Sequence, residues 1–173
     1  AWRIRNIEAA VSHKHQESWA EFKSSNCDVA LIVETDATWQ PQSGSGLRCA
    51  VEELATDVPC YINLAGGLSA EEISITHLGV SKTQAAPPGF ARYRVPVTNT
   101  SCAYVINQPM AELLLDYCQT RRESLSLGID WLVNAAFLDA KQEDRRIDCW
   151  HAEPPVLDHG SISGSTKSWH PDR

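Results

Sequence analysis

Apolar residues recur at three- and four-residue spacing in several segments of the chain, and the residues between them are mostly polar or charged. This period predicts helices that bury one face. The clearest helix covers residues 6–24. Its inward stripe consists of Ile7, Val11, His15, Trp19 and Phe22. Further helices are expected at residues 47–56, from residue 108 onward and at residues 129–138.

Short runs of β-branched or alternating apolar residues, bounded by turn residues, predict strands. The run at residues 28–33 suits a strand that is buried on both faces, as in the interior of a parallel sheet. Other strands are expected at residues 59–64, 73–76, 92–97, 101–106 and 147–150. Because the predicted strands alternate with helices, the sequence indicates an α/β layer fold.

The length of 173 residues is typical of a single domain. We expect one α/β domain over residues 1–157. Residues 158–173 are rich in Ser and Gly and are expected to form a C-terminal loop or tail. Glycine and proline interrupt the pattern between residues 65 and 95, where we expect a loop that covers a ligand.

The charge balance excludes some classes of partner. The chain has 15 Lys and Arg against 22 Asp and Glu, a net charge of −7, which does not favour a general nucleic-acid or anionic-membrane surface. An anionic ligand therefore needs a local site or a bridging cation. The longest apolar run, residues 29–33, is far shorter than the roughly 20 residues of a membrane-spanning helix. We expect no nucleic-acid partner, no transmembrane segment and a cytoplasmic location that allows peripheral contact with a membrane.

The cysteines are spread along the chain without a CxxC or other clustered spacing of metal ligands. Most stand in apolar stretches, which is typical of reduced core residues. Their even number also permits three disulfides. They are Cys27, Cys49, Cys60, Cys102, Cys118 and Cys149.

Two acids, Glu34 and Asp36, directly follow the apolar run at residues 29–33. Strand alternation would place both carboxylates on one side of the chain, at the end of the strand where α/β sheets bind ligands. Two carboxylates there are natural ligands for Mg²⁺ or Mn²⁺, and such an ion could bridge to a diphosphate and offset its charge as it leaves. The alternative is a pair of solvated acids that ends a strand.

Six short motifs follow one another along the chain. They are Val11-Ser12-His13, Leu31-Ile32-Val33-Glu34-Thr35-Asp36, Thr100-Ser101-Cys102-Ala103-Tyr104-Val105-Ile106-Asn107, Met110-Ala111-Glu112-Leu113-Leu114, Gly128-Ile129-Asp130-Trp131-Leu132 and Pro154-Pro155-Val156-Leu157. In this order the chain resembles glycosyltransferase family 25, which includes lipooligosaccharide and collagen β-galactosyltransferases. The resemblance covers nearly the whole chain. It implies a GT-A-like nucleotide-sugar-binding fold with a mostly parallel central sheet flanked by helices.

The chain departs from the family pattern at two places. Thr35 replaces the middle acid of the family's Glu-Asp-Asp-like motif, which leaves an acid-x-acid pair. Family members also carry an N-terminal strand well before the Ser-His helix, whereas this chain begins at about that helix. The resemblance therefore implies a fold truncated at the N-terminus, in which a partner chain or a missing N-terminal segment completes the nucleotide pocket.

The resemblance also implies a reaction, namely metal-dependent transfer of a hexose from a nucleotide-sugar to a hydroxyl, with inversion. The implied donor is UDP-galactose, the acceptor is a glycan or a lipid-linked saccharide, and the biological setting is lipopolysaccharide biosynthesis. The implied cofactor is Mn²⁺ or Mg²⁺. Such a mechanism needs a base for the acceptor and a cation for the leaving diphosphate.

Single residues receive expected roles in this scheme. Asp130, at the start of a predicted helix, is the expected catalytic base, although a plain helix N-terminal acid explains it as well. The expected metal ligands are Glu34, Asp36 and His159. The expected substrate contacts are Ser12, His13, Thr98, Thr100 and Tyr104. The alternatives are a surface or packing histidine at position 13, ordinary turn chemistry at positions 98–100 and a tail histidine at position 159.

Other polar and aromatic side chains are further candidates. Asn99 shares the polar turn, and Lys167 with Ser168 could contact phosphate from the tail. Tryptophans could stack on a sugar or a base, although most tryptophans are simply buried. They are Trp39, Trp131, Trp150 and Trp169.

Two other functions compete with the transferase. The first is a catalytically silent nucleotide- or carbohydrate-binding domain related to glycosyltransferases. The second is a metal hydrolase that uses Glu34, Asp36 and histidines, although the sequence has no HExxH or nucleophile-elbow motif.

Overall fold

The computed structural model describes most of the chain, and none of the helices among the described residues is long and apolar enough to cross a membrane. The described residues are 2–41, 43–54, 57–65, 82–83, 89–98, 100–121, 126–160 and 164. The helices are α1 (Trp2–Lys23), α2 (Ser43–Glu53), α4 (Gln108–Thr120) and α5 (Ile129–Gln142). The strands are β1 (Val29–Val33), β2 (Ala37–Trp39), β3 (Cys60–Asn63), β4 (Lys82–Thr83), β5 (Phe90–Tyr93), β6 (Ala103–Asn107), β7 (Asp148–Ala152) and β8 (Leu157–His159).

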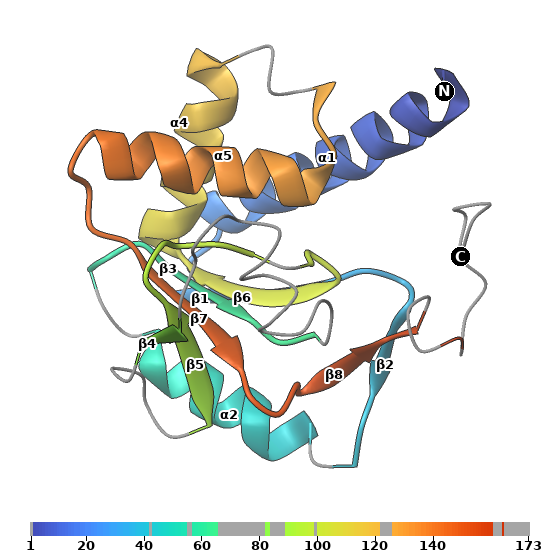
Figure 1. Cartoon of the computed structure of the whole chain (residues 1–173), viewed down its shortest axis with the longest axis vertical. Coiled ribbons are helices and arrows are strands. Elements are labelled where there is room, and N and C mark those ends of the chain that lie inside the picture. The colour runs from blue at the N-terminus through green and yellow to red at the C-terminus, as the bar shows by residue number, and fades with distance from the viewer. Residues whose placement is uncertain are drawn as a thin grey trace.

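Six strands form the main sheet in the order β1-β6-β3-β7-β5-β4 (Figure 1). Only β3 and β7 pair in parallel, and the other neighbours pair antiparallel. The expected α/β fold is confirmed, but the expected mostly parallel sheet is wrong for the described strands. An apolar run does not determine the direction of a strand. The expected burial of β1 on both faces is also wrong, because β1 lies at the edge of the sheet and leaves Leu31 and Val33 exposed. Here β6 lies between β1 and β3 and runs opposite to both, so β1 and β3 point the same way.

Helices cover both faces of this sheet, with α1, α4 and α5 on one face and α2 on the other (Figure 1). Successive strand residues therefore enter different cores. In β3, Tyr61 packs with the three-helix layer and Ile62 packs on the α2 side. In β6, Tyr104 packs with the three-helix layer and Val105 packs on the α2 side. Burial on both faces is the reason that these strands contain unbroken apolar runs.

The strands β2 and β8 form a separate antiparallel ribbon. Ala37 pairs with His159, and Trp39 pairs with Leu157. The residue before β8 is tied to the main sheet, because the Val156 N–H donates to the Leu64 carbonyl at 2.8 Å. Because β2 follows β1 after a short turn, and Leu64 follows β3, the ribbon lies at the carboxyl ends of both strands.

Most predicted elements are present with shifted ends. The helix α1 begins at Trp2 rather than residue 6, and α2 begins at Ser43 rather than residue 47. The ribbon was not predicted, and Asp158 and His159, expected in the C-terminal tail, belong to β8. The strand expected at residues 73–76 and most of the expected ligand-covering loop lie outside the described residues.

The cysteines are all free, which confirms the reduced state expected from the sequence over the alternative of three disulfides. Four are buried, as a core position requires. Two, Cys27 and Cys49, are exposed, which contradicts a core position for them. The buried ones are Cys60, Cys102, Cys118 and Cys149.

Gly46 in α2 packs directly against Val156, and this contact yields a stability prediction. A Cβ at position 46 would approach the Val156 Cγ2 to 2.5 Å, and Val156 is a buried, β-branched side chain with little freedom to move. We predict that Gly46→Ala lowers the free energy of unfolding, measured by urea denaturation, by about 1–3 kcal/mol.

Gly44 in the same helix is the matched control, because a Cβ there meets nothing within 4 Å. Gly44→Ala should raise the free energy of unfolding by about 0.5–1 kcal/mol through helix propensity. Equal effects of the two substitutions would contradict close packing at Gly46.

Candidate metal centre

The acidic motif lies in a turn rather than in a strand. The strand β1 ends at Val33, and β2 begins only at Ala37. The Glu34 N–H donates to the Cys102 carbonyl at 2.7 Å, and the Ala37 N–H donates to the Glu34 carbonyl at 3.2 Å. Strand alternation therefore stops at Val33. As a result, the two carboxylates contact different residues, contrary to the expectation that both bind one metal ion. Glu34 contacts His15, and Asp36 contacts Cys102 and His159.

Asp36 faces the ribbon. Its carbonyl accepts a hydrogen bond from the Gly160 N–H at 2.8 Å, and the neighbouring Ala37 pairs with His159. This register places the His159 Nε2 3.8 Å from the Asp36 Oδ2. The two residues are 123 positions apart in the sequence, so only the β2–β8 pairing brings them together.

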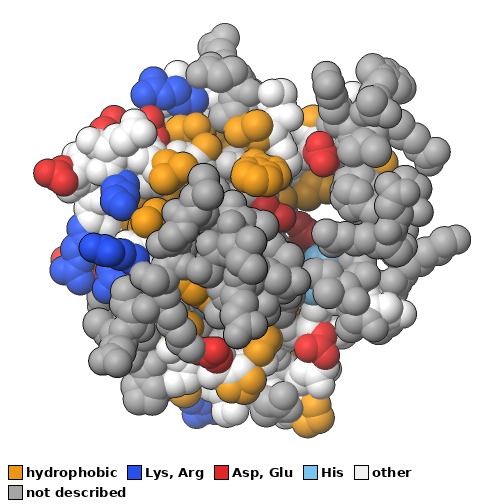
Figure 2. All heavy atoms as spheres, in the orientation of Figure 1, with side chains coloured by type: hydrophobic (Ala, Val, Ile, Leu, Met, Phe, Trp, Pro, Cys, Tyr) orange, Lys and Arg blue, Asp and Glu red, His pale blue; other side chains and the backbone are white. Residues whose placement is uncertain are grey.

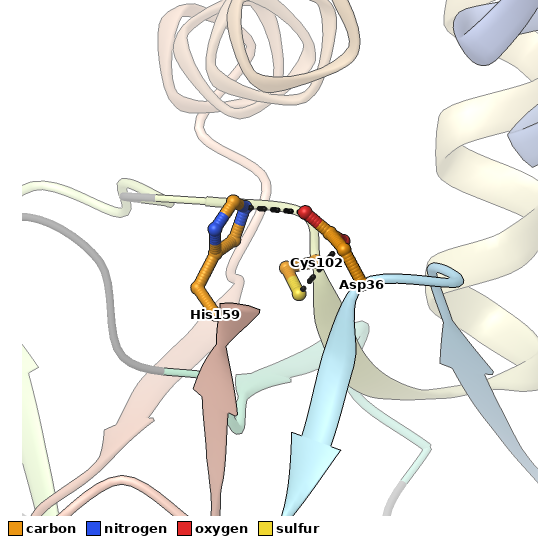
Figure 3. A group of neighbouring side chains, drawn as sticks. All are labelled: Asp36, Cys102 and His159. Carbon is orange, nitrogen blue, oxygen red and sulfur yellow. Dashed lines mark hydrogen bonds and ion pairs between the residues drawn. The ribbon is translucent and has the colours of Figure 1, made fainter. Parts of the chain in front are cut away.

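Cys102 completes a group of three possible metal ligands with Asp36 and His159 (Figure 3). It immediately precedes β6, and the pairing of Ala103 with Val33 brings it beside the turn that carries Asp36. Its Sγ lies 3.6 Å from the Asp36 Oδ1. The three ligand atoms all lie within 4.8 Å of one another. Carboxylate, thiol and imidazole are the side chains that bind transition metals in proteins, so this group could hold a metal ion.

The environment of Cys102 keeps its thiol protonated when no ion is present. Burial raises the pKa of the thiol, and the nearby carboxylates of Asp36 and Glu34 raise it further. A bound cation would reverse this effect, because a coordinating thiol is deprotonated outright.

Glu34 is held in a different contact, on the side of α1. Its Oε1 lies 3.1 Å from the His15 Nε2, and the His15 Nδ1 lies 2.7 Å from the Tyr104 hydroxyl. The same hydroxyl accepts a hydrogen bond from the Trp19 Nε1–H at 2.9 Å. Among the described residues Glu34 is therefore not part of the three-residue group. Cys102 stands there instead of Glu34, which was expected as a metal ligand.

Asp130 stands in the first turn of α5, next to these acids. Burial raises the pKa of its carboxyl, the neighbouring polar groups of Ser101 lower it, and the negative charge of Glu34 raises it again. Its Oδ1 is buried and has no hydrogen-bond partner among the described residues. Figure 2 shows acidic side chains and a histidine side chain together in a recess near the middle of this face.

Four of the expected substrate contacts are buried and already hydrogen-bonded inside the protein. The Ser12 hydroxyl donates to the Leu127 carbonyl at 2.8 Å. Tyr104 is completely buried, and the Thr98 hydroxyl lies 3.1 Å from the Tyr61 hydroxyl. The Thr100 hydroxyl accepts from the Cys102 N–H at 3.2 Å. Their placement gives them roles in packing and in shaping the site, and it offers no support for contact with a sugar.

The remaining candidates are scattered. His13 lies on the exposed face of α1, where its Nε2 is 3.5 Å from Glu17. Trp150 is half-buried and packs against Phe90. Trp39 and Trp131 are exposed, by 57% and 64%. The positions outside the described residues are Asn99, Lys167, Ser168 and Trp169.

Two residues of the site were not among the candidates. His15 carried a detectable signal, since it is the one titratable side chain in the apolar stripe predicted for α1. A polar side chain at a buried helix position must find a partner, and its partners are Tyr104 and Glu34. Cys102 carried no such signal, because only the β1–β6 pairing places it beside Asp36.

Comparison with known proteins does not name a family. No protein-family model matches the chain, and no curated protein matches it. The geometry of this site is accordingly the basis for the function proposed below.

The environment of Asp130 yields a pH prediction. Because its pKa is raised, the folded protein binds this proton more tightly than the unfolded chain does. Its contribution to stability is present below the ordinary value of 3.8 and is lost as the pH rises through the folded-state pKa. We predict that Asp130→Asn unfolds at higher urea concentration than the wild type at pH 8, with the difference shrinking towards pH 4.

The matched control is Asp116→Asn, which removes an exposed carboxylate from α4. Its effect should not grow with pH in this way. Measurements in the presence of a chelator keep metal binding out of the comparison. A constant effect of Asp130→Asn from pH 4 to pH 8 would contradict the raised pKa.

Proposed function

We propose that the protein is a metal-dependent glycosyltransferase that moves a hexose from a UDP-sugar, with galactose as the preferred sugar, to a hydroxyl of a glycan or lipid-linked saccharide, with inversion. The observation that carries this proposal is the grouping of Asp36, from the acid-x-acid motif, with His159 and Cys102 at the carboxyl ends of β1 and β3. Asp130 lies close enough for Glu34 and Cys102 to interact electrostatically with it. A cation site and a carboxylate base are the two parts that this reaction needs.

The arrangement of the sheet supports a GT-A-like fold. The acid motif follows β1, and β1 and β3 run in one direction with the antiparallel β6 between them. In open α/β sheets, ligands bind outside the carboxyl ends of the strands. The motif, the ribbon and the Leu64 end of β3 meet at that end. The family resemblance in the order of motifs and this placement of the acid motif point to the same class of enzyme.

The residues of the site have separate tasks in this mechanism. Asp36 and His159 would hold the ion, and a bound ion would supply positive charge that offsets the negative charge of the departing diphosphate. Asp130 accepts the proton of the acceptor hydroxyl as that oxygen bonds to the anomeric carbon and the bond from carbon to the diphosphate oxygen breaks. Attack from the face opposite the leaving group inverts the anomeric centre. A raised pKa makes the ionised Asp130 a stronger base than an exposed aspartate.

Two exposed tryptophans are close in sequence to residues of the site. Trp131 directly follows Asp130, and Trp39 lies three residues beyond Asp36, in β2. Broad aromatic surfaces that remain exposed are suited to stacking on a sugar or a uracil ring. We assign these two side chains, rather than the buried threonines and Tyr104, to substrate contact.

One observation favours the silent binding domain as a second candidate. Glu34 is committed to His15, so half of the acid-x-acid motif is not available to an ion in this arrangement. In addition, β1 is an edge strand whose outer side pairs with no described strand, and its Leu31 and Val33 are partly exposed. No described strand lies beside the outer edge of β1, where it could complete a nucleotide pocket.

Titration of UDP into the protein with and without Mn²⁺ tests the proposal. We expect binding that depends on Mn²⁺ and a loss of at least about tenfold in affinity for Asp36→Asn, since the ion is held less tightly. Asp28→Asn, at the opposite end of β1, is the matched control and should bind as the wild type does. UDP binding that is unchanged by chelator would contradict the metal-dependent function.

Transfer from UDP-galactose and from other UDP-sugars to hydroxyl acceptors tests the base. We predict that Asp130→Asn lowers kcat by about 10²–10⁴-fold and leaves the affinity for UDP nearly unchanged, because the carboxylate acts only on the acceptor proton. Asp116→Asn should leave both quantities unchanged. Normal turnover in Asp130→Asn would place the base elsewhere, and UDP binding without transfer would favour the silent binding domain.

A further inference from the structure

The donor atoms of the metal centre are not those of a magnesium site. They are one carboxylate oxygen, one imidazole nitrogen and one sulfur, from Asp36, His159 and Cys102 (Figure 3). We propose that Cys102 is a metal ligand, bound as the thiolate, and that the centre selects zinc and zinc-like ions over Mg²⁺. This inference deepens the proposed function because it concerns the same ion, but it requires only metal binding and no transfer.

The distances approach those around a small tetrahedral ion, since the three ligand atoms all lie within 4.8 Å of one another. In a zinc site, bonds of about 2.0–2.3 Å hold neighbouring ligand atoms roughly 3.3–3.8 Å apart. The Cys102 Sγ lies 3.6 Å from one Asp36 oxygen, and the His159 Nε2 lies 3.8 Å from the other. In the structure, one oxygen of the Asp36 carboxylate faces Cys102 and the other faces His159. A rotation of this carboxylate would direct one oxygen, together with the Cys102 sulfur and the His159 nitrogen, at a single metal position.

The chemistry of the donors decides between the ions. Mg²⁺ prefers an octahedral shell of oxygens and gives up its water reluctantly, so a thiol and an imidazole are poor ligands for it. Zn²⁺ and Co²⁺ bind sulfur and nitrogen strongly, and Mn²⁺ is the weakest of the transition ions at such a site. When the ion binds, a metal–sulfur bond forms and the thiol proton passes to the buffer. The Mn²⁺ or Mg²⁺ that the family resemblance implies would therefore bind less tightly than Zn²⁺.

Hydrogen bonds of the backbone hold Cys102 and Asp36 in place, and the β2–β8 pairing holds His159. The Cys102 carbonyl accepts from the Glu34 N–H at 2.7 Å, and the Cys102 N–H donates to the Thr100 hydroxyl at 3.2 Å. Asp36 is tied to the end of β8 by the Gly160 N–H. The three protein ligands found among the described residues would leave one tetrahedral position open, which is the pattern of catalytic rather than structural zinc sites. Water or a diphosphate oxygen can occupy that position.

Titration of the chelator-treated full chain with Co²⁺ tests the inference without any assay of transfer. Co²⁺ stands in for Zn²⁺, and a cobalt–thiolate bond gives a charge-transfer absorption in the near ultraviolet that oxygen and nitrogen ligands do not give. We expect this band to saturate at one ion per chain. One equivalent of Zn²⁺ should abolish it, and a large excess of Mg²⁺ should leave it intact.

Variants identify the thiol. Cys102→Ser should lose the charge-transfer band and bind Co²⁺ at least about tenfold more weakly. The double variant Cys27→Ser/Cys49→Ser removes both exposed cysteines and should keep the full band. If Cys102→Ser does not fold, His159→Gln is the second variant, and it must weaken Co²⁺ binding and alter the band.

Several results would overturn the inference. These are a wild-type cobalt complex without the thiolate band, a band that survives in Cys102→Ser or disappears in the exposed-cysteine variant, and displacement of Co²⁺ by Mg²⁺ at equal concentration. The outcome is separable from that of the proposed function. Metal-dependent transfer without a thiolate band contradicts only the role of Cys102, and a thiolate band without UDP binding or transfer contradicts only the transferase.

Discussion

The Tyr104 hydroxyl is the point where the helical layer, the sheet and the acidic motif meet. It accepts a hydrogen bond from the Trp19 indole N–H, which can only donate, and it faces the His15 Nδ1 at 2.7 Å. All partners are satisfied when Tyr104 donates to the His15 Nδ1 and the His15 Nε2–H donates to Glu34. The phenol is completely buried and stacks on Tyr61 at 4.8 Å between ring centres. In such surroundings an unpaired donor or acceptor costs about 1–3 kcal/mol, so the chain of hydrogen bonds fixes α1 against β6.

This chain of hydrogen bonds separates the functions of the two acids. Glu34 is drawn to the α1 side by His15, and Asp36 is left to the ribbon and to Cys102. The β1–β6 register, with Val33 opposite Ala103, sets the position of Cys102. The β2–β8 register, with Ala37 opposite His159, sets the position of the imidazole. One short turn between β1 and β2 thus connects the buried core on one side with the candidate metal centre on the other.

Local periodicity in the sequence predicted most helices and strands, because burial of one helix face or of both strand faces leaves a pattern in neighbouring residues. The direction of β6 and the β2–β8 ribbon left no such pattern, since they depend on residues that are far apart in the chain. Asp36 and His159 were expected to share a metal, and in the structure their side chains lie 3.8 Å apart. Glu34 was expected to join them, but its carboxylate contacts His15 instead. The recruitment of Cys102 could not be predicted, because its position depends on strand pairing.

The charges of the centre suggest how an acidic protein would hold an anionic donor. A divalent ion bound by the Asp36 carboxylate, the Cys102 thiolate and a neutral His159 forms a centre with no net charge. In the proposed transferase, such a centre would attract a diphosphate through an open coordination position rather than through long-range electrostatics. Glu34 and Asp130 lie close by and would repel free anions, which favours a donor that replaces water directly on the metal. The negative charge of Glu34 also helps to raise the pKa of Asp130, which would make it a stronger base in the proposed mechanism. The Cys102 thiolate, Glu34 and Asp130 together therefore favour a donor that coordinates the ion directly over one that is attracted by a positively charged surface.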